Sequence, residues 1–173
     1  MSRYLQKNKL FFEFAKSLRT LSTCIRRQEA AIIYTLDCSR IVSIGYNGAP
    51  SGVSNDKCLE SIGDSKKQYL PCKCVDADMN ALVKLGDHPV HSLIMYTTLC
   101  PSVQAAGLIA NCRSIQGVIF GSKMKVMDPT TMNRMDGETI LSECGVPSIL
   151  EQDLNLTIPD PQLEVWRGLW PPR

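Results

Sequence analysis

The sequence predicts an α/β domain in which helices pack on a β-sheet. Residues 91–98 form an apolar run, residues 101–112 have helical character with Pro101 in the first turn, and residues 117–121 form a second apolar run. This strand, helix, strand order is typical of a sheet covered by helices. With 173 residues, 44% of them hydrophobic, the chain has the size of one domain with a substantial core.

The remaining elements follow from local patterns. Two β-branched runs, 30–35 and 41–44, predict an antiparallel hairpin. Residues 76–85 and 131–144 predict helices, closed by Gly86 and Gly145, and residues 148–150 an edge strand. A helix over residues 7–24 is predicted by five apolar residues at three- and four-residue spacing: Leu10, Phe11, Phe14, Leu18 and Leu21.

We expect residues 1–150 to form the domain and residues 151–173 to form an extended tail. The tail contains several prolines together with Trp166 and Trp170. Tryptophan combines a large apolar surface with one polar group, so we expect both rings to pack on the domain or on a neighbouring subunit.

Charge and hydropathy exclude some partners and locations. A formal charge of +2, from 19 basic and 17 acidic residues, creates no field that favours nucleic acid or a membrane surface. No apolar run approaches the ~18 residues of a membrane span, so a cytoplasmic protein is expected. Residues 3–27 contain a single acid, Glu13, as organellar transit peptides do, but their apolar spacing suits a packed helix better.

Eight cysteines in an intracellular chain point to metal before disulfides, because disulfide frameworks belong mostly to short secreted chains. Cys38, Cys112 and Cys144 each stand alone near apolar residues, and we interpret them as small hydrophobic side chains.

Three segments resemble the deoxycytidylate (dCMP) deaminases: residues 22–28 (Ser-Thr-Cys-Ile-Arg-Arg-Gln), 45–52 (Gly-Tyr-Asn-Gly-Ala-Pro-Ser-Gly) and 75–81 (Val-Asp-Ala-Asp-Met-Asn-Ala). The resemblance covers roughly residues 10 to 125. It implies the three-layer cytidine deaminase-like fold, with a mixed five-stranded sheet flanked by helices and an active site between two helix N-termini. It also implies a homo-oligomer or a subunit of a larger assembly.

The resemblance further implies a pyrimidine deoxynucleotide ligand such as dCMP, dCTP or dTTP. By match, Asn47 would contact the nucleotide, next to Gly48, and Arg26 and Arg27 stand where a phosphate could be paired. A departure from the family at residues 28–31, where its common Val-Gly pair is Glu29-Ala30, affects the same pocket. The alternative is that the turn alone requires the loop and that both arginines are solvated or contact another subunit.

The positions that hold the catalytic zinc in this family carry other residues here. Asp76 stands where the metal-binding His belongs, Asp78 where the proton-transferring Glu belongs, and Ser102 and Ala105 where two Cys belong. One carboxylate, one hydroxyl and one methyl group do not make a catalytic zinc site, so no catalytic zinc is expected. Asp76 would then simply cap a helix. Cys100 with Asp76 or Asp78 is an alternative metal site.

Four further cysteines predict a structural zinc. Some dCMP deaminases hold a second zinc that joins the end of the first helix to the long loop and to the segment before the catalytic helix. Cys24, Cys58, Cys72 and Cys74 occupy those places, and four thiolates suit a closed tetrahedral site. The alternative is four free thiols.

These residues predict a catalytically inactive dCMP deaminase-like protein with a regulatory, sequestering or assembly role. The alternative is an active zinc-dependent dCMP deaminase with an atypical site. A nucleic-acid-binding scaffold is disfavoured by the balanced charge and by an aromatic content of 6%.

Overall fold

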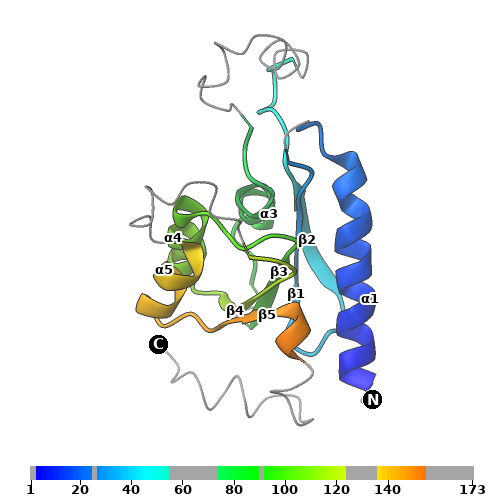
Figure 1. Cartoon of the computed structure of the whole chain (residues 1–173), viewed down its shortest axis with the longest axis vertical. Helices are drawn as coiled ribbons and strands as arrows, with labels where there is room; N and C mark the ends of the chain where they lie inside the picture. The colour runs from blue at the N-terminus through cyan, green and yellow to red at the C-terminus, as the bar shows by residue number, and fades with distance from the viewer. Residues whose placement is uncertain (1–2, 25–26, 55–73, 90–91, 124–135, 155–173) are drawn as a thin grey trace.

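The computed structural model describes residues 3–24, 27–54, 74–89, 92–123 and 136–154 (Figure 1). Its helices and strands in chain order are α1 (Arg3–Leu18), the short 3-10 helix η1 (Arg19–Leu21), β1 (Ala30–Thr35), β2 (Ile41–Tyr46), α3 (Ala77–Leu85), β3 (Leu93–Thr97), α4 (Val103–Asn111), β4 (Ile115–Phe120), α5 (Gly137–Glu143), β5 (Ser148–Leu150) and η4 (Glu151–Asp153). The predicted hairpin, the helix and strand order and the edge strand at 148–150 are confirmed.

The sheet is mixed and has five strands in the order β2-β1-β3-β4-β5. β1 pairs antiparallel with β2 and β3, whereas β3, β4 and β5 run parallel. Because α4 connects two adjacent parallel strands, the carboxyl end of β3 leads directly towards the N-terminus of α4. The α/β class and the five-stranded sheet are therefore as the sequence and the resemblance imply.

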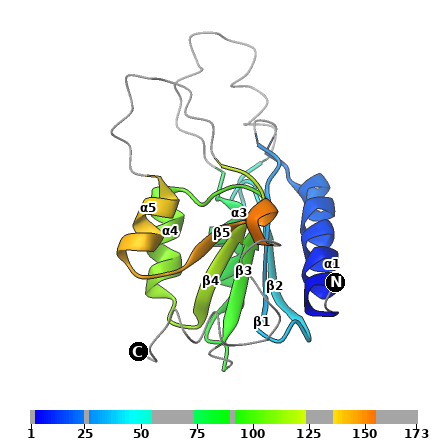
Figure 2. The ribbon, with the colours of Figure 1, turned by 60° about the horizontal axis from the view of Figure 1, so that its bottom comes forward.

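Helices cover both faces of the sheet. Figures 1 and 2 show α1 on one face and α3, α4 and α5 on the other. β1 is buried at every position. Its side chains alternate, so that Ile32 and Tyr34 join the core under α1, while Ala31 and Ile33 join the core under α3 and α4. This alternation creates two apolar cores and makes the domain three-layered.

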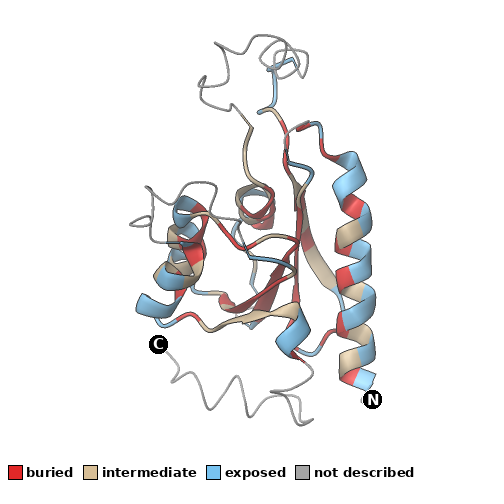
Figure 3. Cartoon of the chain, viewed as in Figure 1, coloured by how far each residue is buried: buried red, intermediate tan, exposed pale blue. Residues whose placement is uncertain are grey.

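The predicted buried face of α1 is partly right: Leu18 is buried and Phe11 packs against the core, but the other three predicted residues are exposed. Leu10, Phe14 and Leu21 are 69%, 44% and 53% exposed. The buried residues of α1 are Tyr4, Asn8, Phe12, Ala15 and Leu18. Figure 3 shows the buried parts of this helix on the side that faces the sheet.

Asn8 explains the error. Its Oδ1 accepts a 2.7 Å hydrogen bond from the Tyr34 hydroxyl, and its Nδ2 donates to the Tyr4 carbonyl at 3.1 Å. A polar residue satisfied in this way is stable in a core, but in a hydrophobicity pattern it marks the wrong face. The α-helix also ends at Leu18 and continues as η1, not as α-helix to residue 24.

Other predictions have mixed outcomes. Cys38 is buried and Cys112 half-buried, but Cys144 is exposed at the end of α5, so its interpretation as a buried hydrophobic side chain is wrong. The start of the helix predicted over residues 131–144 and the tail from residue 155 onward lie outside the described residues. No helix among the described residues has the length and apolar character needed to span a membrane.

Candidate functional site between two helix N-termini

A small pocket lies where the N-termini of α3 and α4 face the carboxyl end of β3. Its volume is about 50 Å³. The residues that line it come from the segment before β1, the loop after β2, the two helix starts and the end of β3: Arg27, Glu29, Ala30, Asn47, Asp76, Ala77, Asp78, Thr97, Leu99, Cys100 and Ser102. The structure thus brings Arg27, Asn47, Asp76, Asp78 and Ser102 to one place, whereas Gly48 and Ala105 are not among the lining residues.

Asn47 fixes the start of α3. Its Oδ1 accepts a 2.7 Å hydrogen bond from the Ala77 N–H, and its Nδ2 donates to the Arg27 carbonyl at 3.3 Å. The side chain is buried, and it satisfies one of the N–H groups that a helix start leaves without an intrahelical partner. Asn47 therefore has a structural function that the resemblance to nucleotide-binding loops does not reveal.

Gly48 continues this connection through its backbone. It pairs with Val75, with hydrogen bonds of 3.3 Å and 2.9 Å between the two backbones. A Cβ at Gly48 would lie 2.9 Å from the Thr23 hydroxyl oxygen, so a larger residue would require the Thr23 side chain to shift. Arg26, the remaining nucleotide-binding candidate, lies outside the described residues.

Asp76 and Ser102, at the starts of α3 and α4, are joined by a hydrogen bond. The Ser102 hydroxyl donates to Asp76 Oδ2 at 3.0 Å. The same Ser102 oxygen caps α4, because it accepts a 3.3 Å hydrogen bond from the Ala105 N–H. Asp76 occupies the N-cap position of α3 without a capping hydrogen bond from its side chain, so the predicted capping role of its carboxylate is wrong.

Ala105, the fourth position of the predicted set, lies one turn into α4 and is fully buried. Its methyl group packs there and offers no electron pair to a metal or ligand. Of the four predicted positions, Asp76, Asp78 and Ser102 can therefore offer a metal only oxygen atoms.

Asp78 is a buried acid. Only 5% of it is exposed, and its Oδ1 accepts a 2.8 Å hydrogen bond from the Met79 N–H. Burial raises the pKa of its carboxyl group to about 6, and the nearby charge of Asp76 adds to the rise. Asp78 therefore exchanges a proton close to neutral pH.

Cys100 lines the same pocket with a thiol that stays protonated, because burial raises its pKa to about 11. Metal ions bind the deprotonated thiolate, so this thiol would have to lose its proton first. Among the described residues there is no group of three or more His, Cys, Asp or Glu positioned to hold a metal ion.

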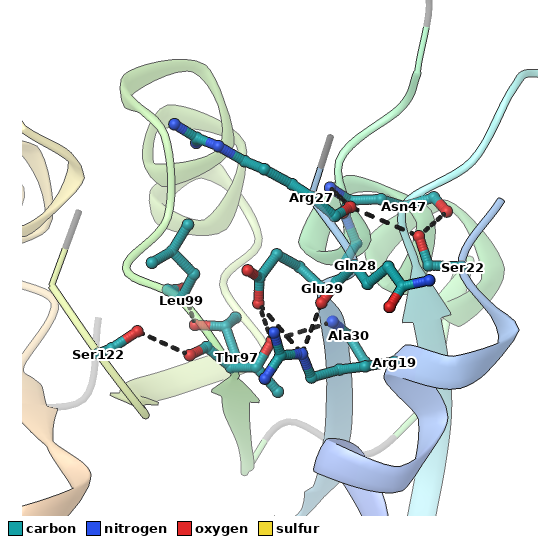
Figure 4. A network of polar contacts seen from close by, with 12 residues as sticks. Arg19, Ser22, Arg27, Gln28, Glu29, Ala30, Asn47, Thr97, Leu99 and Ser122 are labelled. Atoms are coloured by element: carbon teal, nitrogen blue, oxygen red, sulfur yellow. Dashed lines mark hydrogen bonds and ion pairs between the residues drawn. The ribbon is translucent and has the colours of Figure 1, made fainter. Parts of the chain in front are cut away.

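Glu29 also lines the pocket, although it was not predicted as a site residue (Figure 4). Its carboxylate accepts a hydrogen bond from the Thr98 hydroxyl and lies 3.8 Å from the Arg19 Nε. Thr98 in turn accepts a 3.0 Å hydrogen bond from the Ala30 N–H. The Glu29-Ala30 departure from the family pattern is the signal that pointed here. The pocket therefore has three carboxylates in its wall and one arginine, Arg27.

The chain is similar in sequence to deoxycytidylate deaminases. No family model matches the chain. It is 32% identical over 112 residues to a probable deoxycytidylate deaminase of Caenorhabditis elegans, covering 63% of this chain and 54% of that protein, and 29% identical over 102 residues to the deoxycytidylate deaminase of Mus musculus, covering 56% and 55%. The chain thus spans about half the length of the curated relatives it matches.

Among solved structures, the dCMP deaminase of the cyanophage S-TIM5 in complex with dCMP and dUMP superposes with a TM-score of 0.65. The match covers 87% of this chain and 98% of that one at 20% identity. The chain adopts the cytidine deaminase-like fold. Sequence similarity and fold together support the dCMP deaminase family.

Two of the four cysteines of the structural-zinc set are described in this deaminase-like fold. Cys24 is buried and Cys74 half-buried, whereas Cys58 and Cys72 lie outside the described residues. Thr23 donates its N–H to the Asn47 carbonyl at 3.2 Å, and Val75 pairs with the adjoining Gly48. Cys24 and Cys74 therefore each adjoin a residue, Thr23 or Val75, that is hydrogen-bonded to the turn at residues 47–48.

Proposed function

We propose that this chain is a non-catalytic dCMP deaminase-like protein with a regulatory, sequestering or assembly role. The observation that carries this proposal is the 3.0 Å hydrogen bond between Ser102 and Asp76. By the resemblance, both residues stand at metal-ligand positions of the family. In this chain their side chains bond to each other, and the third position, Ala105, has no donor atom.

The donor set does not fit a catalytic zinc. Catalytic zinc sites usually have three protein ligands, with imidazole nitrogen and thiolate sulfur prominent among them, and keep a place for water. Here a carboxylate and a hydroxyl meet, and the hydroxyl already donates to the carboxylate and accepts from the Ala105 N–H. Asp78 can hold a proton near neutral pH, but that alone does not supply a nucleophile for C4 of cytosine.

Activity and metal content together test the proposal. Purified protein is expected to release no ammonia from dCMP and form no dUMP. The variant carrying Asp76→His, Asp78→Glu, Ser102→Cys and Ala105→Cys is expected to bind one more zinc per chain than the wild type. Turnover by the unaltered protein that disappears in Asp78→Ala would establish the rival function, an active dCMP deaminase with an atypical site.

We also propose a structural zinc held by Cys24, Cys58, Cys72 and Cys74. Cys24 and Cys74 lie beside segments that share the Asn47–Gly48 turn, and thiolates suit a closed tetrahedral site. We expect about one zinc per chain, lost in Cys74→Ser together with thermal stability, because such binding energy contributes directly to folding. Cys144→Ser, an exposed cysteine at the end of α5, is the matched control. Metal-free protein of unchanged stability would exclude this site.

A pyrimidine deoxynucleotide remains the proposed ligand of the pocket. Its support is that Arg27 and Asn47 line one pocket and that the cyanophage dCMP deaminase was solved with dCMP and dUMP. A volume of about 50 Å³ is below the roughly 300–1,000 Å³ of small-molecule sites, so the pocket must open for a base to enter.

Thermal shifts measure this ligand binding. A ligand that binds only the folded state at 100 times its Kd stabilises it by about 2.7 kcal/mol, so dCMP, dCTP or dTTP should raise Tm with concentration. The shift should shrink in Arg27→Ala and persist in Arg40→Ala, an exposed arginine outside the pocket. No shift with any of these nucleotides at millimolar concentration favours a purely structural or assembly role, for which light scattering would show a homo-oligomer.

A further inference from the structure

A second cavity lies between α1 and the end of the described chain. Its volume is about 310 Å³, at the lower end of the roughly 300–1,000 Å³ typical of clefts that hold an organic group. We call it the α1 groove. Figures 1 and 2 show η4 beside α1 at this place. The residues that line the groove are Leu5, Lys9, Phe12, Lys16, Gly121, Glu151, Gln152 and Leu154.

The groove combines apolar and cationic walls. Leu5, Phe12 and Leu154 supply the apolar surface. Lys16 is neutralised by Glu151 at 2.8 Å, whereas Lys9 makes no ion pair within the described part of the chain. A suitable occupant therefore presents a large apolar side chain and a nearby carboxylate.

The adjoining part of this chain has that chemistry. Leu154, the last described residue before the C-terminal segment, is buried in the groove wall. Residues 155–173 contain both tryptophans of the protein, together with Asp160 and Glu164. We propose that the α1 groove binds a tryptophan of this C-terminal segment in the same chain, with Lys9 pairing one of the two acids.

Reach and effective concentration favour the chain's own segment over a second copy. Trp166 follows Leu154 by 12 residues, and a chain of that length spans up to roughly 40 Å when extended. α1 itself has 16 residues and is about 24 Å long. A segment attached at the groove wall encounters the groove at millimolar effective concentration, far above that of a second molecule in dilute solution.

Intrinsic fluorescence is a direct test, because Trp166 and Trp170 are the only tryptophans in the sequence. The full chain is expected to emit at shorter wavelength than the same chain in denaturant and to resist acrylamide quenching. Trp166→Phe and Trp170→Phe each leave a single reporter and identify which ring is bound. A native emission spectrum and quenching constant equal to those of the unfolded chain would overturn the proposal.

Variants of the groove locate the binding place. Leu5→Gln and Lys9→Glu should shift the emission to longer wavelength and raise the quenching constant at least twofold. Leu10→Gln, on the exposed side of the same helix, should change neither. Circular dichroism verifies that each variant is folded, and if Leu5→Gln is not folded, the result for Lys9→Glu is the one that tests the location.

Chemical cross-linking tests the ion pair. Carbodiimide should join Lys9 to Asp160 or Glu164 within one chain. Binding within the chain would be refuted if dilution of the protein removed the protection of the tryptophans from acrylamide, or if the cross-link joined two different chains.

Discussion

Replacing Asp78 by asparagine should stabilise this protein at neutral pH, whereas most substitutions of buried residues destabilise. Asp78 is 5% exposed, and burial, followed by the charge of Asp76, raises the pKa of its carboxyl group from 3.8 to about 6. Each pKa unit corresponds to about 1.4 kcal/mol, so ionised Asp78 costs the folded state up to about 3 kcal/mol. Asparagine keeps an oxygen that accepts from the Met79 N–H and carries no charge.

The sign of the pH dependence follows from proton binding. Between pH 3.8 and about 6 the folded state binds more protons at Asp78 than the unfolded state does, so its contribution to stability falls as pH rises through this window. Below the window Asp78 is protonated in both states, and wild type and Asp78→Asn should be equally stable. Above it the variant should be more stable by up to about 3 kcal/mol.

Urea denaturation at pH 4, near the lower end of this window, and at pH 7.5, above it, measures how the difference in stability grows with pH. Other groups titrate in both proteins, so the quantity of interest is the difference between the two free energies of unfolding at each pH. Asp87→Asn, an exposed acid just beyond α3, is the control and should change stability by less than about 0.5 kcal/mol. A difference between wild type and Asp78→Asn that is the same at both pH values would refute the reasoning.

Other substitutions test how the site is built. Gly45→Ala should prevent folding or lower Tm sharply, because its Cβ would lie 2.0 Å from the Ala77 carbonyl oxygen; Gly107→Ala, with open space around its Cβ, should leave Tm unchanged or raised. Asn47→Ala should cost about 1–3 kcal/mol in urea denaturation by removing the partner of the Ala77 N–H, whereas Asn47→Asp should recover most of that loss. Equal effects of the two Asn47 variants would contradict its role at the start of α3.

The sequence predicted elements well where one pattern dominates. Residues 30–35 and 41–46 form β-strands because β-branched residues suit a buried sheet, and α3 ends at Gly86, whose φ of +57° favours glycine. The packed face of α1 was predicted in part, at Leu18 and Phe11, but the place of Asn8 in it depends on a hydrogen bond to Tyr34, a residue 26 positions away. A periodicity of hydrophobicity contains no information on such a partner.

The same limit applies to the candidate site. Resemblance brought Asp76, Ser102 and Asn47 to one pocket because motif order fixes which helix starts face each other. It did not predict the hydrogen bond between Asp76 and Ser102, or that both ends of the Asn47 side-chain amide form hydrogen bonds with the protein backbone. Those bonds depend on side-chain geometry between segments that lie far apart in the sequence.

Packing, not the Asp76–Ser102 hydrogen bond, holds α3 and α4 in place. A hydrogen bond to a charged group contributes about 1.5–3 kcal/mol at best, and this one is only partly buried. The buried faces of the two helices lie in one apolar core, in which α3 contributes Ala77, Ala81 and Leu85 and α4 contributes Ala106 and Ile109. Changing the polar residues at the helix starts should therefore leave the helices in position. In the fourfold variant the main cost is expected at Ala105, where a sulfur atom must enter a fully buried site at about 1–3 kcal/mol. A bound zinc would offset that cost, so folded but metal-free protein would mean that the helix starts are not spaced to share a metal.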